Sequence, residues 1–171
     1  MVFINYFCCF IIIFSLQTTL LPSLSWGGVT PSLTLIFAVY CGIHFRGGRG
    51  TAMGFLIGLV QDGLSGGLLG INTLSKSLVA FALFKIRDKV VVEGVIPVGC
   101  LIIGASLFDG AVYYVASATL LKAGISAGTL FPLLPAYALY NMLAASILFY
   151  LLDRNRKWLL RKNPSQATRP S

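Results

Sequence analysis

Residues Gly50–Ser77 read GTAMGFLIGLVQDGLSGGLLGINTLSKS, and this stretch decides how we expect the chain to fold. It is apolar enough to enter a membrane, yet it contains Asp62 and Lys76, and charged side chains are costly in a bilayer. Glycines crowd its middle, and glycine loosens a helix. We therefore predict a helix, a glycine-rich turn, and a second helix that carries Lys76 back past Asp62.

Three glycines of the first predicted helix, Gly50, Gly54 and Gly58, recur at every fourth position. Each step of four residues moves the position around the helix by only about 40°, so these glycines form a bare ridge that leads up to Asp62. A bare ridge allows another helix to approach closely. Two interpretations remain open: the ridge packs within the chain, or it contacts another protein.

The composition is that of an integral membrane protein. Of 171 residues, 57% are hydrophobic and only 11% are charged, and the mean hydropathy is +0.86. A soluble domain of this size carries far more charge. We expect one transmembrane helical domain over residues 1–152, followed by a basic cytoplasmic tail over residues 153–171 whose distal part is disordered.

Apolar segments predict an all-α bundle of about six transmembrane helices, with bounds that carry an error of a few residues. The expected spans run from about Val2 to Leu21, Val29 to Phe45, Thr51 to Gly66, Leu69 to Ile86, Val92 to beyond Tyr114, and Pro132 or Pro135 to Leu152. The third of these spans is short for a helix that crosses a bilayer.

The net charge of +8 does not indicate a nucleic-acid partner, because the positive residues lie at the ends of the apolar spans. Eleven of the thirteen lysines and arginines fall on one side of a six-span bundle, Lys122 falls on the other, and Lys76 lies within a span. The positive-inside rule then places both termini in the cytoplasm. The basic tail segment RNRKWLLRK is expected to lie along the lipid bilayer.

Three ionisable side chains remain inside the spans: Asp62, Lys76 and Asp109. Counted at about 1.5 Å per helical residue, all three lie in the outer half of the membrane at similar depth, so Lys76 can pair with Asp62 or with Asp109. The cluster is a candidate polar site for a ligand, an ion or a partner. The alternative is a structural role, as a buried ion pair or as side chains that reach water. Ser65 is expected to cap the next helix or to face the external water.

Nothing in the sequence indicates catalysis. The motifs G-x-S-x-G, H-E-x-x-H and the P-loop are absent, and no spacing suggests a metal site or a cofactor site. The single histidine, His44, is expected at the cytoplasmic edge in contact with solvent, on the side opposite the polar cluster.

The stretch GFLIGLVQDGLSGGLLGINTLSKSLVAF, Gly54–Phe81, resembles the MreD family of rod shape-determining proteins. That family consists of small bacterial inner-membrane proteins with five or six spans and a central G-x3-G-x3-D-x2-S-G-x2-L-G-type run. The positions that match are Gly54, Gly58, Asp62, Ser65, Gly66, Leu69 and Gly70. We take the helix-packing motif to comprise Gly50, Gly54, Gly58, Ser65, Gly66 and Gly70. The family is also similar in architecture to the six-helix substrate-binding subunits of energy-coupling-factor transporters.

The resemblance implies a non-enzymatic part of the machinery for cell elongation and peptidoglycan synthesis, in the bacterial inner membrane. Its implied partners are MreC, the actin-like MreB, the glycosyltransferase RodA and the transpeptidase that works with RodA. The alternative is a vitamin-like small-molecule binding subunit of a transporter, which predicts an occluded, aromatic-lined pocket around Asp62, Lys76 and Asp109. The outward loops are short and carry few polar groups, which favours the first hypothesis.

Overall fold

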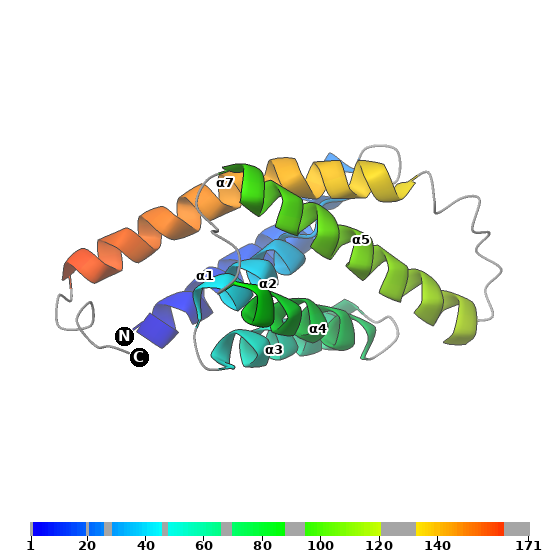
Figure 1. Cartoon of the computed structure of the whole chain (residues 1–171), viewed down its shortest axis with the longest axis horizontal. Coiled ribbons are helices and arrows are strands. Elements are labelled where there is room, and N and C mark those ends of the chain that lie inside the picture. Colours follow the sequence, from blue (N-terminus) through cyan, green and yellow to red (C-terminus); the bar gives the residue numbers. More distant parts are fainter. Residues whose placement is uncertain are drawn as a thin grey trace.

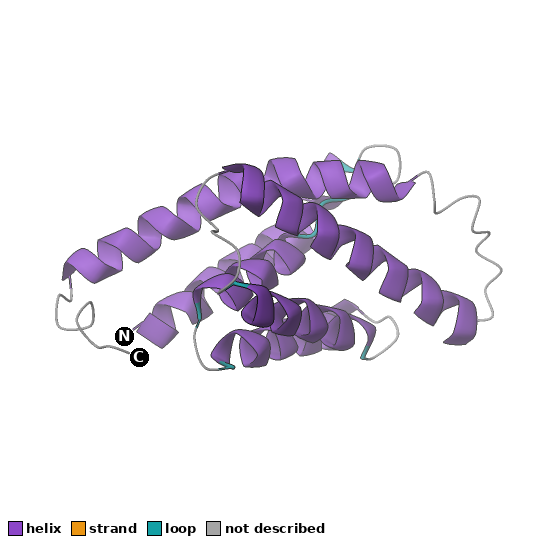
Figure 2. Ribbon diagram, in the orientation of Figure 1, coloured by secondary structure: helices purple, strands orange, loops and turns teal. Residues whose placement is uncertain are grey.

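The computed structural model describes residues 2–19, 21–25, 29–45, 48–65, 70–87, 95–120 and 133–162. These residues form helices joined by loops and turns (Figure 2), which confirms the predicted all-α class. The helices are α1 (Val2–Thr19), α2 (Leu33–His44), α3 (Arg49–Ser65), α4 (Ile71–Ile86), α5 (Val95–Leu120) and α7 (Leu133–Lys162). A short 3₁₀ turn, Leu21–Leu24, follows α1.

Successive helices run in opposite directions, so that the beginning of α1 and the end of α7 lie at the same end of the molecule (Figure 1). The central helix is α2, which packs against α1, α3, α4, α5 and α7. Its residues from Leu35 to Cys41 have no exposed surface. An α-helix that is apolar all round is stable only where neighbours surround it, and the sequence of α2 meets that condition.

The helices differ in how well they match the thickness of a bilayer. Two stretches, Ile96–Ala116 in α5 and Leu133–Asn155 in α7, are long and apolar enough to cross a membrane. The helices α3 and α4 have 17 and 16 residues, fewer than the about 20 of a typical span. The last helix also continues ten residues past the predicted end at Leu152, as far as Lys162.

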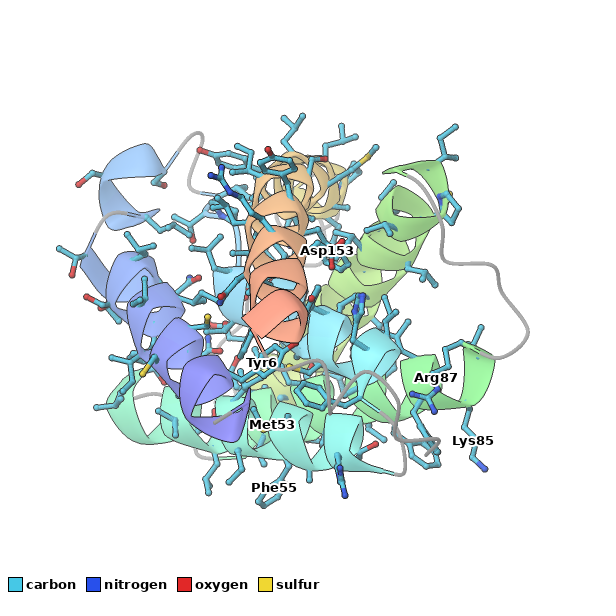
Figure 3. All side chains as sticks on the ribbon, turned by 90° about the vertical axis from the view of Figure 1, so that its left-hand side faces the viewer. Tyr6, Met53, Phe55, Lys85, Arg87 and Asp153 are labelled. Atoms are coloured by element: carbon cyan, nitrogen blue, oxygen red, sulfur yellow. The ribbon has the colours of Figure 1, made fainter. Side chains whose placement is uncertain are left out.

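Large apolar side chains cover the outer faces of the bundle. On α7, Leu143 and Ile147 are each 68% exposed, and on α3 the side chain of Phe55 points away from the other helices (Figure 3). Exposing such an apolar surface to water is unfavourable, whereas contact with lipid or with the helix of a partner removes that cost.

Candidate functional site

The glycine ridge of α3 packs against α2 and α4 of the same chain. A Cβ atom added to Gly58 would stand 2.5 Å from the Cα of Thr73, and one added to Gly54 would stand 2.7 Å from the carbonyl oxygen of Lys76. A Cβ on Gly50 would stand 2.7 Å from the carbonyl oxygen of Cys41. These are backbone atoms, which cannot move aside as the end of a side chain can. Glycine therefore sets the close approach of α3 to α4 and to α2.

The ridge ends at Asp62, and the structure makes this residue the cap of the following helix. Its Oδ2 accepts the backbone N–H groups of Gly70 and Thr73, each at 2.9 Å, and the Thr73 hydroxyl at 2.6 Å. Its Oδ1 accepts the backbone N–H of Asn72 at 3.1 Å and the side-chain amide of Asn72 at 3.0 Å. The first N–H groups of a helix have no partner within that helix, and here the carboxylate of another helix supplies one.

The remaining motif residues surround this cap. Gly70 precedes α4 with a φ of 100°, a left-handed conformation that glycine adopts without strain. The hydroxyl of Ser65 donates to the carbonyl of Asp62 at 3.4 Å, so Ser65 bonds back to its own helix and the capping role belongs to Asp62. Gly66 lies outside the described residues.

Lys76 has no exposed surface. Of its two predicted partners, Asp62 and Asp109, it forms an ion pair with Asp109. Its Nζ lies 3.8 Å from Oδ1 of Asp109 and donates to Oδ1 of Asn72 at 2.8 Å. Asp109 also accepts the Ser75 hydroxyl at 2.5 Å and the Tyr137 hydroxyl at 3.0 Å. This cluster ties α4 to α5 and α7, and Asn72 connects it to the cap at Asp62.

A second group of buried polar residues was not predicted. The side chain of Asn141, on α7, has no exposed surface; its oxygen accepts the backbone N–H of Ser32 at 2.7 Å and its nitrogen donates to the Ser106 hydroxyl at 2.9 Å. The predicted polar site was assembled from ionisable residues within the spans, so Asn141 was not included. An asparagine in the apolar run ALYNMLAAS was the signal that could have revealed it.

Two glutamines lie near these buried polar residues, on α1 and α3. We call Gln17, Ser32, Gln61, Ser106 and Asn141, together with the cluster around Asp109, the polar layer. The side-chain oxygen of Gln17, on α1, accepts the backbone N–H of Leu33 at 2.7 Å. The side-chain oxygen of Gln61, on α3, accepts the hydroxyl of Thr34 at 2.8 Å. Each of the described helices therefore contributes polar side chains to this layer, which lies near the ends of α1 and α3 and the beginnings of α2 and α4 and includes Ser106 and Asp109 of α5 and Asn141 of α7.

A cavity of about 410 Å³ opens at this level. Of the three predicted site residues, Asp109 lines it, whereas Asp62 and Lys76 lie outside its wall. The lining residues are Gln17, Val29, Thr30, Pro31, Ser32, Gln61, Ile71, Asn72, Asp109, Gly110, Tyr113, Leu133, Leu134 and Tyr137.

His44 lies at the opposite end of the bundle from the polar cluster, as expected, but the expectation that its side chain is in contact with solvent was largely wrong. Its side chain is only 18% exposed, and its ring stacks on Tyr40 with 4.1 Å between ring centroids. Its Nε2 lies 3.6 Å from Oδ1 of Asp153, which also accepts the Tyr40 hydroxyl at 3.1 Å. His44 at the end of α2 is thus held by the carboxylate of Asp153 on α7, which lies far from it in the sequence.

The described residues contain no group of three or more histidine, cysteine or acidic side chains that could hold a metal ion. Their buried charges and amides are instead directed toward one another and toward backbone groups. What this arrangement does is to hold short, glycine-interrupted helices in register within an apolar bundle.

No curated protein and no solved structure matches the chain. The family model described as rod shape-determining protein MreD matches residues 1–152, which cover all of the helical bundle except the end of α7. The resemblance found in the residues around Asp62 is thereby confirmed across the chain. The chain belongs to the MreD family, a family of membrane proteins with a role in determining rod shape.

Proposed function

We propose that the protein is a non-catalytic component of the cell-elongation machinery in the bacterial inner membrane, and that it acts as a scaffold for peptidoglycan synthesis. Its direct partner is an MreC-type membrane protein, and the assembly includes an MreB-type actin homologue, a RodA-type glycosyltransferase and the transpeptidase of that enzyme. Membership of the MreD family supports the role in rod shape.

One observation carries the scaffold role: the buried charges of the bundle are used to hold helices together. The carboxylate of Asp62 accepts five hydrogen bonds from residues 70–73, and Lys76 is enclosed with Asp109 and Asn72. A buried charge that loses its partner is strongly destabilising, so these charges favour the one arrangement of helices in which each has its partners. A rigid body of this kind suits a protein whose task is to position others.

The partner surface is formed by the apolar helix faces that the polar cluster holds in place. Leu59 on α3 is 48% exposed and Leu143 on α7 is 68% exposed, on two different helices. In a membrane, such faces contact lipid or a partner helix, and close packing decides between the two.

In this proposal the six helices span the membrane with both termini in the cytoplasm, as the distribution of basic residues predicts. The alternating directions of the helices support that topology (Figure 1). The similarity to the substrate-binding subunits of energy-coupling-factor transporters stays a prediction.

Co-purification from the native membrane in mild detergent, with a tag at the C-terminus, tests the proposal. We expect to recover MreC-type and RodA-type proteins. Photo-crosslinking residues placed at Leu59 or at Leu143 would then identify which exposed face contacts the partner, each position serving as the control for the other. Recovery of an ATPase pair with a membrane coupling subunit, and of no elongation protein, would replace the scaffold by the transporter subunit.

A further inference from the structure

The polar layer encloses a cavity that the hydrogen bonds between the helices do not fill. Its volume of about 410 Å³ lies within the range of about 300–1,000 Å³ that is typical of small-molecule sites. Residues of α1, α3, α4, α5 and α7 and of segment 29–32 line it, and its wall contains polar and aromatic side chains as well as leucine, valine and isoleucine. A concave site with a few directed polar groups is the form that ligand pockets take.

The charges at the cavity indicate what class of ligand it holds. Among the described residues that line the cavity, Asp109 is the only acidic or basic one, and the Nζ of Lys76 lies 3.8 Å from its Oδ1, so the two charges balance. A charged ligand would have to leave water without gaining an unpaired opposite charge in return. A neutral ligand does not have that cost.

The hydrogen-bonding groups of the wall are not exhausted by the network. The Thr34 hydroxyl uses the oxygen of Gln61, so the two N–H groups of that amide are directed elsewhere. A carboxylate accepts about four hydrogen bonds. Oδ1 of Asp109 accepts the Ser75 hydroxyl and faces Lys76, whereas Oδ2 accepts the Tyr137 hydroxyl and keeps room for a further donor. The wall thus offers both donors and acceptors to a ligand.

Two tyrosine rings add aromatic surface to the apolar part of the site. Tyr137 is held by its hydroxyl bond to Asp109, whereas Tyr113 lies at the rim with 52% of its surface exposed. An aromatic ring with a polar tip packs against the flat apolar face of a ring-shaped ligand and bonds to the groups at its edge.

We propose that this cavity binds a neutral ring that carries several hydroxyl or amide groups, as a sugar does, either free or as the head group of a glycolipid. This inference does not depend on the scaffold role. It concerns what one molecule binds, whereas the scaffold role concerns which proteins it assembles with.

The test uses the purified full chain in lipid nanodiscs and three probes. The first is free N-acetylglucosamine, the second is octyl N-acetyl-β-glucosaminide, and the third is tetraethylene glycol monooctyl ether, which has the same alkyl chain without the sugar. We expect saturable binding of the sugar probes and no competition by the third. Equal affinity for the first two probes indicates a free sugar, and much tighter binding of the glucosaminide indicates a glycolipid.

Two pairs of variants locate the site. Tyr113→Ala removes a ring from the rim and should weaken binding by about tenfold or more, whereas Tyr150→Ala removes another exposed tyrosine, outside the wall, and should have no effect. Leu133→Trp narrows the cavity and should also weaken binding, whereas Leu139→Trp, outside the wall on the same helix, should not.

The proposal is wrong if neither sugar probe binds the wild-type chain, or if Tyr113→Ala and Tyr150→Ala bind alike. Neither result affects the scaffold role, because co-purification of partners with the wild-type chain is measured without any sugar probe. The reverse also holds: loss of partners would leave the binding assay unchanged.

Discussion

The carboxylate of Asp62, near the end of α3, holds both the backbone N–H of Thr73 at 2.9 Å and its hydroxyl at 2.6 Å, on the first turn of α4. One helix thereby caps the next across the glycine turn. This relationship explains why an acidic residue stands in an apolar segment, where it would otherwise be costly.

Asp62→Ala should destabilise the protein more than any conservative change in the tail. The substitution leaves the N–H groups of Gly70, Asn72 and Thr73 without their acceptor. Gly70 is exposed and can bond to water, whereas Thr73 is buried, and a buried donor left unpaired costs about 1–3 kcal/mol. Thermal unfolding of the purified protein measures the effect. Asp62→Asn keeps one acceptor oxygen, so its unfolding temperature should lie between those of Asp62→Ala and the tail control Arg169→Lys. Unchanged stability and complex yield in Asp62→Ala would contradict the capping role.

Gly58→Ala should destabilise the bundle by about 1–3 kcal/mol, because its methyl group would press against the backbone of α4. Gly63→Ala is the matched control on the same helix, since a Cβ there meets no atom within 4 Å. That control should be neutral or stabilising by up to about 1 kcal/mol, because alanine favours a helix. Equal unfolding temperatures of the two variants would show that α3 and α4 are not in close contact.

The pair formed by Lys76 and Asp109 should behave as a unit in a double-mutant cycle. Lys76→Met alone leaves a largely buried carboxylate without its cation, and losing one partner of a buried pair costs about 3–5 kcal/mol. The double variant Lys76→Met/Asp109→Asn should lose less free energy of unfolding than the sum of the losses in the two single variants. Additive effects on the unfolding temperature would indicate that the two charges do not interact.

Reporter fusions should place both termini in the cytoplasm. A fluorescent protein that folds only in the cytoplasm should fluoresce when it is fused after Ser171, because the basic residues near the ends of the spans stay inside. The same reporter fused after Gly67, between the third and fourth predicted spans, should stay dark, and alkaline phosphatase should give the opposite pattern. Fluorescence at both positions would rule out the six-span topology.

Exchange of Asn141 tests the polar layer that was not predicted. Asn141→Leu should lower stability by about 1–3 kcal/mol, because the backbone N–H of Ser32 and the hydroxyl of Ser106 both lose their partner. Ser146→Ala is the control on the same helix, since its exposed hydroxyl bonds only to the preceding turn. A similar unfolding temperature for both variants would mean that the layer contributes little to stability.

Several features of the fold could be read from the sequence because they depend on local composition. Apolar runs located the helices to within a few residues in most cases, and the predicted Leu69–Ile86 is close to α4 at Ile71–Ile86. The end of α7 was predicted ten residues too early, because the segment after Leu152 is basic and its helix is not marked by hydropathy.

The sequence by itself determined that this is an apolar, helical membrane protein of the MreD family, with charged residues at one level of its spans. Only the tertiary structure decided what those charges do. The carboxylate of Asp62 accepts hydrogen bonds from the backbone of α4, and Lys76 forms an ion pair with Asp109. The bond between Asn141 and Ser32 joins residues 109 positions apart. Such partners depend on how helices pack in three dimensions. Spacing along each helix narrowed the partner of Lys76 to two aspartates, but it could not choose between them or predict the bond between Asn141 and Ser32.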